Sequence, residues 1–394
     1  MSHILELPMP VRLAMVFVVG AFLGGAASCC ADRLTARCRS SGLPIRPILI
    51  ALLAGIGLSA LYWWEIGRRG LLPASAAVPL PASVQTVLHG QYAVHVALIW
   101  LMLLASMVDV REKIIPDAIT VPGTLLGLLL AAACPWTLLP DLVIPLPPAF
   151  WQLFSVETWP FIQVASPNRW PAALHGLPNA AALLIGLGCW WMWCLAILPR
   201  SWYARHGRRR AWQLLCARLA REPATYWILL TAVLGSAAIA AVWFCGGRPW
   251  QGLLSALVGM AASGGLVWTV RIIGTAALRR EAMGFGDVTL MAMIGAFLGW
   301  QACLVVFFLA PFAGLIVGLL QLILLRDTEI PYGPFLCLAA VAVIVRWNTV
   351  WDWALGVFAP GWLVPVVVLL CMVLMAVLLG LWRLVLGIFR RGSQ

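Results

Sequence analysis

Long apolar runs, separated by short polar or basic stretches, make up most of this 394-residue chain. A run of about 20 apolar residues can cross a bilayer as an α-helix. The pattern therefore predicts a series of membrane spans, some of full length and some short. We place them at Pro10–Cys30, Pro47–Trp64, Tyr92–Val108, Ala118–Ala133, Ala180–Leu198, Thr225–Cys245, Gly252–Ile273, Val288–Trp300, Cys303–Leu325, Phe335–Val345 and Gly361–Leu386.

Composition agrees with this pattern, since 63% of the residues are hydrophobic and 10% are charged. Soluble globular domains have about 45–50% apolar and about 25% charged residues. We therefore expect an all-α fold, a polytopic transmembrane helical bundle with roughly ten or eleven membrane spans. The whole chain, 1–394, forms a single integral membrane domain. Ahead of the apolar core Leu13–Leu23, Glu6 and a lone Arg12 do not make the basic segment of a signal peptide, so we expect an uncleaved first span.

The net charge of +12 comes almost entirely from arginine, with Lys113 as the sole lysine. The arginines form short clusters between apolar runs, which is typical of cytoplasmic loops and not of a nucleic-acid groove. With the N-terminus outside, alternation puts most clusters on the cytoplasmic side: Arg33–Arg46, Arg111 and Lys113, Arg200–Arg221, Arg279 and Arg280, Arg326, and Arg390 and Arg391. The other side receives Arg12, Arg68, Arg69, Arg169, Arg248 and Arg346. The lipid bilayer is thus an expected partner, and nucleic acid is not.

Three segments between the spans have a distinct composition. Residues 31–46 form a short cytoplasmic loop, and residues 199–223 form a strongly basic one. Residues 135–179 are a Pro- and Trp-rich extracytoplasmic insertion, whose Trp side chains suit the level of the lipid headgroups. The 11 cysteines lack the spacing of a structural zinc site, and the 5 histidines are scattered. We expect neither a metal site nor a disulfide framework.

Two acids stand where a span meets the cytoplasmic side. Asp109 ends the run Tyr92–Val108, and Asp287 begins the run Val288–Trp300. Taken singly, Asp287 could be the N-cap of a helix and Asp109 a solvated acid in a charged loop. The loop after Asp109 is very short, however, and returns to the membrane at Pro116. An acid held beside lipid is costly, which favours a functional role for the pair.

Paired carboxyl groups that lie close together cannot both ionise easily, so they share a proton. One acid can then activate a water while the other protonates a carbonyl oxygen. Helix polarity suggests the roles, because an anion is favoured at a helix N-terminus and disfavoured at a C-terminus. We therefore expect Asp287 to ionise first as the base, and Asp109 to hold the proton. Arg111 and Lys113 could reverse this order.

Gly284 and Gly286 precede Asp287 in the sequence Gly-Phe-Gly-Asp. A residue without a Cβ lets backbone pass close to a substrate and can adopt a positive φ. We expect these glycines to form an active-site loop against which an extended substrate lies. A GxGD tetrapeptide alone is a weak signal.

Several segments together resemble one known family, the prepilin peptidases, which are membrane aspartic proteases of the GxGD type. The matching segments are GFGDVTL at Gly284–Leu290 with IGAFLGW at Ile294–Trp300 (family GxGDxKL…GAxLGW), DVREKIIPD at Asp109–Asp117 (family D-x5-I-P-D/N) and IPYGPF at Ile330–Phe335 (family IPFGPFL). More weakly, Gly20–Leu23 with Arg33 and Leu34 is similar to the opening GSFLN…RL. In order and spacing the likeness covers about Tyr92–Thr124 and Trp250–Ala340.

The resemblance implies a hydrolase of the bacterial inner (cytoplasmic) membrane, with Asp109 and Asp287 as catalytic residues facing the cytoplasm. It implies cleavage of the basic leader of a type IV prepilin or pseudopilin-like membrane protein after a glycine, the step that serves type IV pilus assembly and type II secretion. No cofactor is needed for proteolysis. S-adenosylmethionine is implied only if the N-methyltransferase activity of many family members is retained.

The chain departs from the family pattern in two places. Thr289 stands where the family usually has Lys, and residues 31–46 are too short for the family's cytoplasmic domain with two CxxC pairs. An Arg-rich surface should repel a basic leader. We therefore expect the acids near the catalytic pair, Glu112, Asp117 and Glu281, to hold the leader.

Three other functions are compatible with parts of the sequence. A proton- or cation-coupled transporter predicts acids near mid-span and an internal repeat, and the sequence has no clear repeat. A catalytically silent scaffold of the same fold would keep the helices without the chemistry. A site for a hard cation on Asp109, Asp117 and Asp287 is a third reading, because such ions take carboxylate ligands.

Overall fold

The computed structural model describes residues 7–35, 45–73, 80–142, 148–168, 170–171, 179–198, 221–279, 281, 283–324 and 331–391. Within these residues the fold is all-α, with one isolated β-bridge between Pro140 and Phe161. The α-helices are α2 Met9–Leu34, α3 Ile45–Tyr62, α4 Ala82–Glu112, α5 Asp117–Ala133, α6 Ala180–Ile197, α8 Pro223–Cys245, α9 Gly247–Leu278, α10 Phe285–Leu324, α11 Gly333–Val345, α12 Trp347–Phe358 and α13 Leu363–Arg391. A π-helical turn, η1 Trp63–Gly67, follows α3, and two short 3-10 helices, η3 Pro135–Thr137 and η4 Pro148–Leu153, follow α5.

The number of spans matches the expected ten or eleven only roughly. Among the described residues, eight helices are long and apolar enough to cross a membrane, and the bent pair α11–α12 would make a ninth. Two features explain the lower number. Helix α5 has 17 residues and falls short of a full span. The two expected elements at Val288–Trp300 and Cys303–Leu325 are counted together as α10, because they join at Gly299 without a loop between them.

Helix α10 is nevertheless broken at Gly299, whose φ of 79° and ψ of 168° are not helical. Residues on both sides of the break, Gly295 and Cys303, lie against the same residue of α9, Ser263. A Cβ on Gly295 would lie 2.5 Å from the Ser263 Oγ, and the Cys303 thiol hydrogen-bonds to Ser263. Eight residues of straight helix span about 12 Å. The chain therefore folds back at Gly299, between the two elements that the sequence pattern separates.

Close backbone contacts join neighbouring helices. A Cβ on Gly259 of α9 would meet the Gly295 carbonyl oxygen at 2.3 Å, and one on Gly20 of α2 would meet the Gly55 Cα of α3 at 3.0 Å. Small residues at such crossings are the usual device of helix packing in membranes, where burial of apolar surface gives little driving force. The main core lies between α4, α10 and α11.

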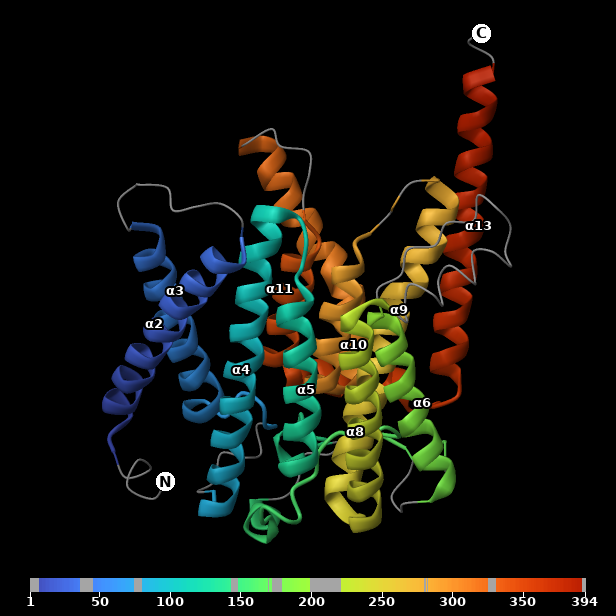
Figure 1. Ribbon diagram of the computed structural model, residues 1–394. Coiled ribbons are helices and arrows are strands. Elements are labelled where there is room, and N and C mark those ends of the chain that lie inside the picture. The colour runs from blue at the N-terminus through green and yellow to red at the C-terminus, as the bar shows by residue number, and fades with distance from the viewer. Residues whose placement is uncertain are drawn as a thin grey trace.

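The bundle has two ends (Figure 1). We call the end that carries the α4–α5 connection and the last turn of α13 the aspartate end, because Asp109 and Asp287 lie there. The described N-terminal residues and the segment after α5 lie at the opposite end (Figure 1). The basic positions Arg37, Arg39, Arg200, Arg205, Arg208–Arg210, Arg218, Arg280 and Arg326 lie outside the described residues.

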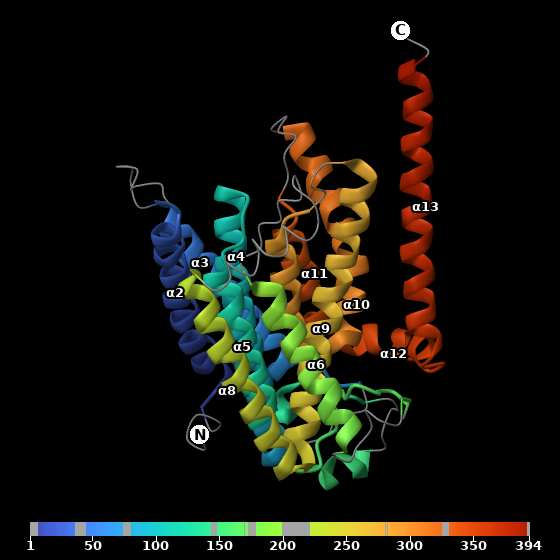
Figure 2. The ribbon, with the colours of Figure 1, turned by 45° about the vertical axis from the view of Figure 1, so that its right-hand side comes forward.

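Helix α12 turns by 93° from α11, and α13 then runs beside the bundle, mostly exposed on its outer face (Figure 2).

At the end of the bundle opposite the aspartate end, the described parts of the 135–179 insertion form a compact cap. Trp151 and Trp159 are fully buried inside it, whereas Trp170 is 49% exposed, so only part of the insertion's tryptophan surface is available to lipid headgroups. Hydrogen bonds from Trp300, Gln301 and Trp347 to backbone carbonyls of the cap fix it onto the bundle.

Candidate active site

Asp109 lies in the last turn of α4 and is 5% exposed, although it stands near a helix end. The helix ends at Lys113, whose left-handed φ of 56° lets its N–H bond to the Asp109 carbonyl oxygen at 2.8 Å. The chain then turns back at once, so Ile115 is buried while Ile114 is 67% exposed. The short loop predicted from the sequence therefore holds Asp109 against the protein and away from bulk water.

Asp287 lies in the first turn of α10 and is 7% exposed. The backbone of Gly284 hydrogen-bonds to its carboxylate, and the Thr289 hydroxyl donates to the Gly286 carbonyl oxygen at 3.1 Å. Gly284, Phe285 and Gly286 thus lead directly into the first helical turn that holds the Asp287 carboxylate. Both aspartates are buried at the same end of the bundle.

Three segments that are far apart in the sequence meet at this point. Gly286 packs on the backbone of Ile115, where an added Cβ would lie 3.0 Å from the carbonyl oxygen and 2.8 Å from the Ile115 Cβ. At the start of α11, the Gly333 N–H donates to the Asp109 Oδ2 at 3.2 Å. A Cβ on Gly333 would lie 2.5 Å from that oxygen and 2.9 Å from the Ile115 Cδ1. The loops carrying the two acids and the start of α11 therefore form one packed site.

The two carboxyl groups interact electrostatically inside this site. Tyr332, directly before Gly333, is half-buried and also lies within reach of the Asp287 charge. Burial, and then the negative charge of Asp287, raise the pKa of the Tyr332 phenol to about 12, so the phenol keeps its proton at neutral pH. The buried Cys337 lies one turn along α11 and faces both acids.

The role expected for Gly284 and Gly286 needs a correction. Neither glycine has a φ in the left-handed region, so backbone freedom is not what these positions require. Gly286 is required by the close approach of Ile115. At Gly284 an added Cβ would make only an ordinary contact, 3.7 Å from the Asp287 Oδ2.

Arg271 is a site residue that the sequence pattern did not identify. From α9 its Nε donates to the Met283 carbonyl oxygen at 2.9 Å, and its guanidinium pairs with Glu281 and lies 5.8 Å from the Phe285 ring centroid. These contacts hold the loop that leads to Asp287. A signal was available, because Arg271 is the only charged residue between Trp250 and Leu278. The sequence identified Tyr332 and Gly333 only as members of the IPYGPF segment and gave them no role in the site.

The expected leader-binding acids lie around the site without forming one group. Glu112 and Asp117 are exposed at the two ends of the α4–α5 loop. Glu281 is exposed but is paired with Arg271, so its charge is partly compensated. Likewise, Arg111 is paired with Asp32 of α2. In addition, each catalytic candidate accepts a backbone hydrogen bond, which the helix-polarity argument did not include. Which acid ionises first therefore stays a prediction.

Fold and site together define a polytopic α-helical membrane protein that brings two aspartates from separate segments together at one end of its bundle. Comparison with known proteins then shows which family it resembles. Residues 218–319, which include the glycine loop, Asp287 and most of α10, match the model of the Type IV leader peptidase family. Over that segment the chain is similar to this family, the prepilin peptidases.

Curated relatives agree. The chain is 34% identical over 108 residues to the prepilin leader peptidase/N-methyltransferase of Aeromonas salmonicida, covering 26% of this chain and 35% of that protein. It is 36% identical over 80 residues to the Legionella pneumophila protein of that name, covering 20% and 28%. The Pseudomonas aeruginosa protein of that name is 35% identical over 90 residues, covering 22% and 30%. The chain thus matches about a third of the length of these relatives. No solved structure gave a significant match.

Proposed function

We propose that this protein is an aspartic endopeptidase that cleaves the basic leader of a prepilin-like or pseudopilin-like membrane protein after a glycine. Asp109 and Asp287 are the catalytic residues, and Gly284 and Gly286 form the loop beside them. The proposal extends to the whole chain what the names of its relatives say of them. It does not include methyl transfer, so S-adenosylmethionine stays a prediction only.

The observation that carries the proposal is the meeting of three distant segments around two buried carboxyl groups. Gly286 rests on Ile115, two residues before the end of the motif that begins at Asp109. Gly333 donates its backbone N–H to Asp109, and the two acids interact electrostatically. Buried, uncompensated acids are costly in a membrane protein, and no ion pair to either acid exists among the described residues. A catalytic role for both acids explains why the protein keeps them buried despite this energetic cost.

The pair can hydrolyse an amide without a cofactor. A water between the carboxyl groups attacks the scissile carbonyl carbon and gives a proton to the ionised aspartate. The protonated aspartate gives its proton to the carbonyl oxygen, which forms a tetrahedral intermediate. The C–N bond then breaks, the amine takes the water's proton from the first aspartate, and the intermediate's hydroxyl returns a proton to the second.

The arrangement also suits a substrate at a membrane surface. Asp109 and Asp287 lie at a helix end, where a leader outside the bilayer can reach them while the following apolar segment stays in the lipid. In our proposal this end faces the cytoplasm of the bacterial inner membrane. Glu112 and Asp117 flank the site and would attract the positive charges of the leader, with Glu281 contributing less because Arg271 pairs with it.

The test is cleavage of candidate prepilin-like proteins from the same genome by the purified protein, with the new N-terminus determined by mass spectrometry. A general acid or base typically contributes about 10²- to 10⁴-fold to a rate. We expect Asp109→Asn and Asp287→Asn each to lower cleavage at least about 100-fold. Asp352→Asn, an exposed acid on α12, is the matched control and should cleave at close to the normal rate.

Two outcomes would contradict the proposal. Cleavage that persists in both aspartate variants would remove these residues from catalysis. Absence of any cleavage by the normal protein, across all candidate substrates, would favour the silent scaffold. Since an Asp→Asn change is isosteric, thermal unfolding of each variant checks that the fold is retained.

A further inference from the structure

Two apolar cavities lie beside α13. Four residues line both of them: Leu304 of α10, Phe358 of α12, and Val364 and Val368 of α13. The first cavity, between α9, α10 and α13, has a volume of about 310 Å³. The second, on the α12 side, has about 430 Å³. Both fall in the size range of about 300–1,000 Å³ that is typical of ligand pockets.

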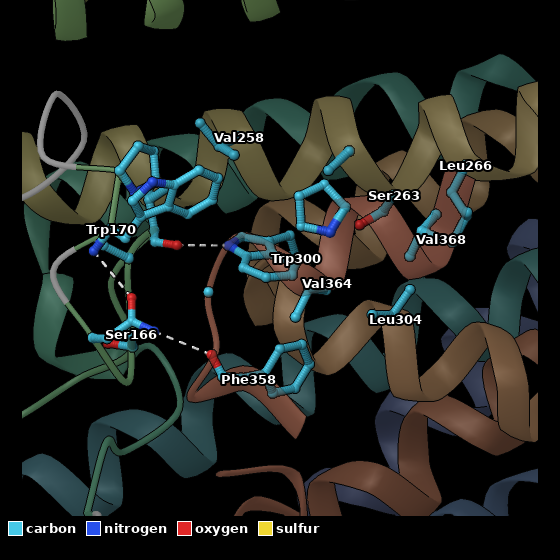
Figure 3. A pocket seen from close by; sticks show the side chains of 17 residues that line it. Ser166, Trp170, Val258, Ser263, Leu266, Trp300, Leu304, Phe358, Val364 and Val368 are labelled. Atoms are coloured by element: carbon cyan, nitrogen blue, oxygen red, sulfur yellow. Dashed lines mark hydrogen bonds between the residues drawn. The ribbon is translucent and has the colours of Figure 1, made fainter. Parts of the chain in front are cut away.

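The first cavity is polar at one end only. Figure 3 shows Ser166 and Trp170 of the cap at one end, and Leu266 and Val368 at the other. Between them the wall is formed by Val258, Trp300 and Leu304. The one hydroxyl along this wall, that of Ser263, already donates to the Gly259 carbonyl oxygen at 2.6 Å. The indole N–H of Trp300 is likewise bonded to the Val164 carbonyl oxygen at 2.8 Å. The wall therefore presents only apolar surface.

The position of the cavity shows which solvent it meets. Its walls belong to α9, α10 and α13, all three of which are long and apolar enough to cross a membrane. Its polar end lies at the cap, where Trp170 and Trp362 are 49% and 59% exposed. Exposed tryptophans mark the level of the lipid headgroups. The cavity thus runs from the headgroup level into the hydrocarbon region.

We propose that this cavity is a binding site for one acyl chain of a membrane phospholipid. The chain lies along Leu304 and Leu266, and the headgroup stays at the level of Trp170 and Asn168. An empty apolar space forfeits the dispersion contacts of every side chain that lines it, and an acyl chain restores them. A bound chain therefore adds apolar contacts between α13 and the wall formed by α9 and α10.

The described lining of the first cavity recognises the acyl chain. No lysine or arginine is among the residues that line the first cavity in the described part of the protein. The polar groups of the cap there are already used, because Asn168 donates to the Phe358 and Ala359 carbonyl oxygens and Ser166 donates to Asp141.

The test is native mass spectrometry of the full-length protein, delipidated in a mild detergent and then incubated with phosphatidylethanolamine or phosphatidylglycerol. Val368→Trp fills the cavity from α13, and Ala262→Phe fills it from the α9 wall. We expect each to lower lipid retention about ten-fold, equivalent to a loss of about 1.4 kcal/mol. The matched control is Val366→Trp, two residues away on α13, which is 48% exposed and lines neither cavity. It should retain lipid as the normal protein does.

Three results would overturn the proposal. The first is that the delipidated normal protein binds neither phospholipid. The second is that Val368→Trp and Ala262→Phe retain as much lipid as Val366→Trp. The third is that the two filling variants bind as much lipid as the normal protein but no longer cleave a co-reconstituted substrate. The first cavity would then receive the membrane helix of the substrate.

Discussion

At the scale of single residues, the site depends on contacts between backbone atoms as much as on the two acids. Gly286 lets the loop before Asp287 rest on Ile115, and Gly333 brings its N–H to Asp109. Arg271 fixes the same loop from α9. The acids could be found from the sequence because carboxyl groups beside apolar runs are rare. The partners of Gly286 and Gly333 could not, since a glycine in a sequence does not reveal which backbone approaches it.

Gly286 is packed against Ile115 and Gly284 is not, so the two loop glycines should differ in their sensitivity to substitution. A Cβ at position 286 would collide with Ile115, so Gly286→Ala must shift the loop and with it Asp287. Misplacement of a catalytic group by about 1 Å can cost about 100-fold in rate. We expect a loss of about that size in the cleavage rate for Gly286→Ala, and a much smaller loss for Gly284→Ala. Steady-state kinetics of the two purified variants would decide, and equal losses would show that the contact with Ile115 is unimportant.

At the scale of the elements, α10 is the least regular helix and the one that places most of the site. Its first part carries Asp287 and packs against α9 through Gly295, and its second part returns beside α11 and α13. The fold-back occurs at the end opposite the site, where Trp300 and Gln301 bond to the cap. The sequence pattern separated two apolar runs here. The single turn that joins them follows from the tertiary structure.

Gly299 should therefore be sensitive to substitution. Its φ of 79° with ψ of 168° is a conformation essentially restricted to glycine, and other residues held there cost about 1–3 kcal/mol. Space is not the limitation, because a Cβ would find its nearest atoms at 3.5 Å. We expect Gly299→Ala to lower the free energy of unfolding by about 1–3 kcal/mol, measured by unfolding in mixed detergent micelles. Gly57→Ala, inside α3 with no atom near the added Cβ, is the control and should not destabilise the protein.

The cap contributes a pH dependence of its own. Burial raises the pKa of the Asp141 carboxyl, although hydrogen bonds from Ser166 and Trp351 lower it in part. The folded protein then holds this proton to a higher pH than the unfolded chain. The resulting stability is present in full below the ordinary aspartate pKa of about 3.9 and is lost as pH rises through the folded value.

We expect Asp141→Asn to reduce this pH dependence, because an amide does not titrate. The measurement is the midpoint of thermal unfolding in detergent between about pH 4 and pH 8, the range above the ordinary aspartate pKa. Asp352→Asn, on the exposed side of the neighbouring helix α12, serves as the control. If the two variants change the pH profile equally, Asp141 is not the responsible group.

At the scale of the whole molecule, the helices alternate between two ends, and the acids share one of them (Figure 1). The described basic residues Arg33, Arg111, Lys113 and Arg279 lie at the ends of α2, α4 and α9 that belong to the aspartate end. Positively charged loops stay in the cytoplasm when membrane proteins insert. The basic residues therefore predict that the aspartate end faces the cytoplasm, which is the orientation proposed for the site.

Reporter fusions test that orientation. A fluorescent protein fused after Gln394 should be fluorescent, and alkaline phosphatase at the same point should be inactive, because the C-terminus would lie in the cytoplasm. The same reporters fused after Ser155, within the cap, should behave in the opposite way. Active phosphatase at the C-terminus would reverse the proposed orientation and place the site outside.

The sequence alone determined that this is a membrane protein, roughly where most of its apolar elements lie, and which two acids stand at the ends of such elements. These properties depend on local composition and on charge asymmetry, both of which can be read along the chain. Only the tertiary structure decided that Ile115 and Gly333 close around the acids, that α10 folds back at Gly299, and that Trp151 and Trp159 are buried inside a cap. The physical reason is that these features depend on contacts between distant segments, and membrane helices pack through small residues whose partners have no signature in the sequence.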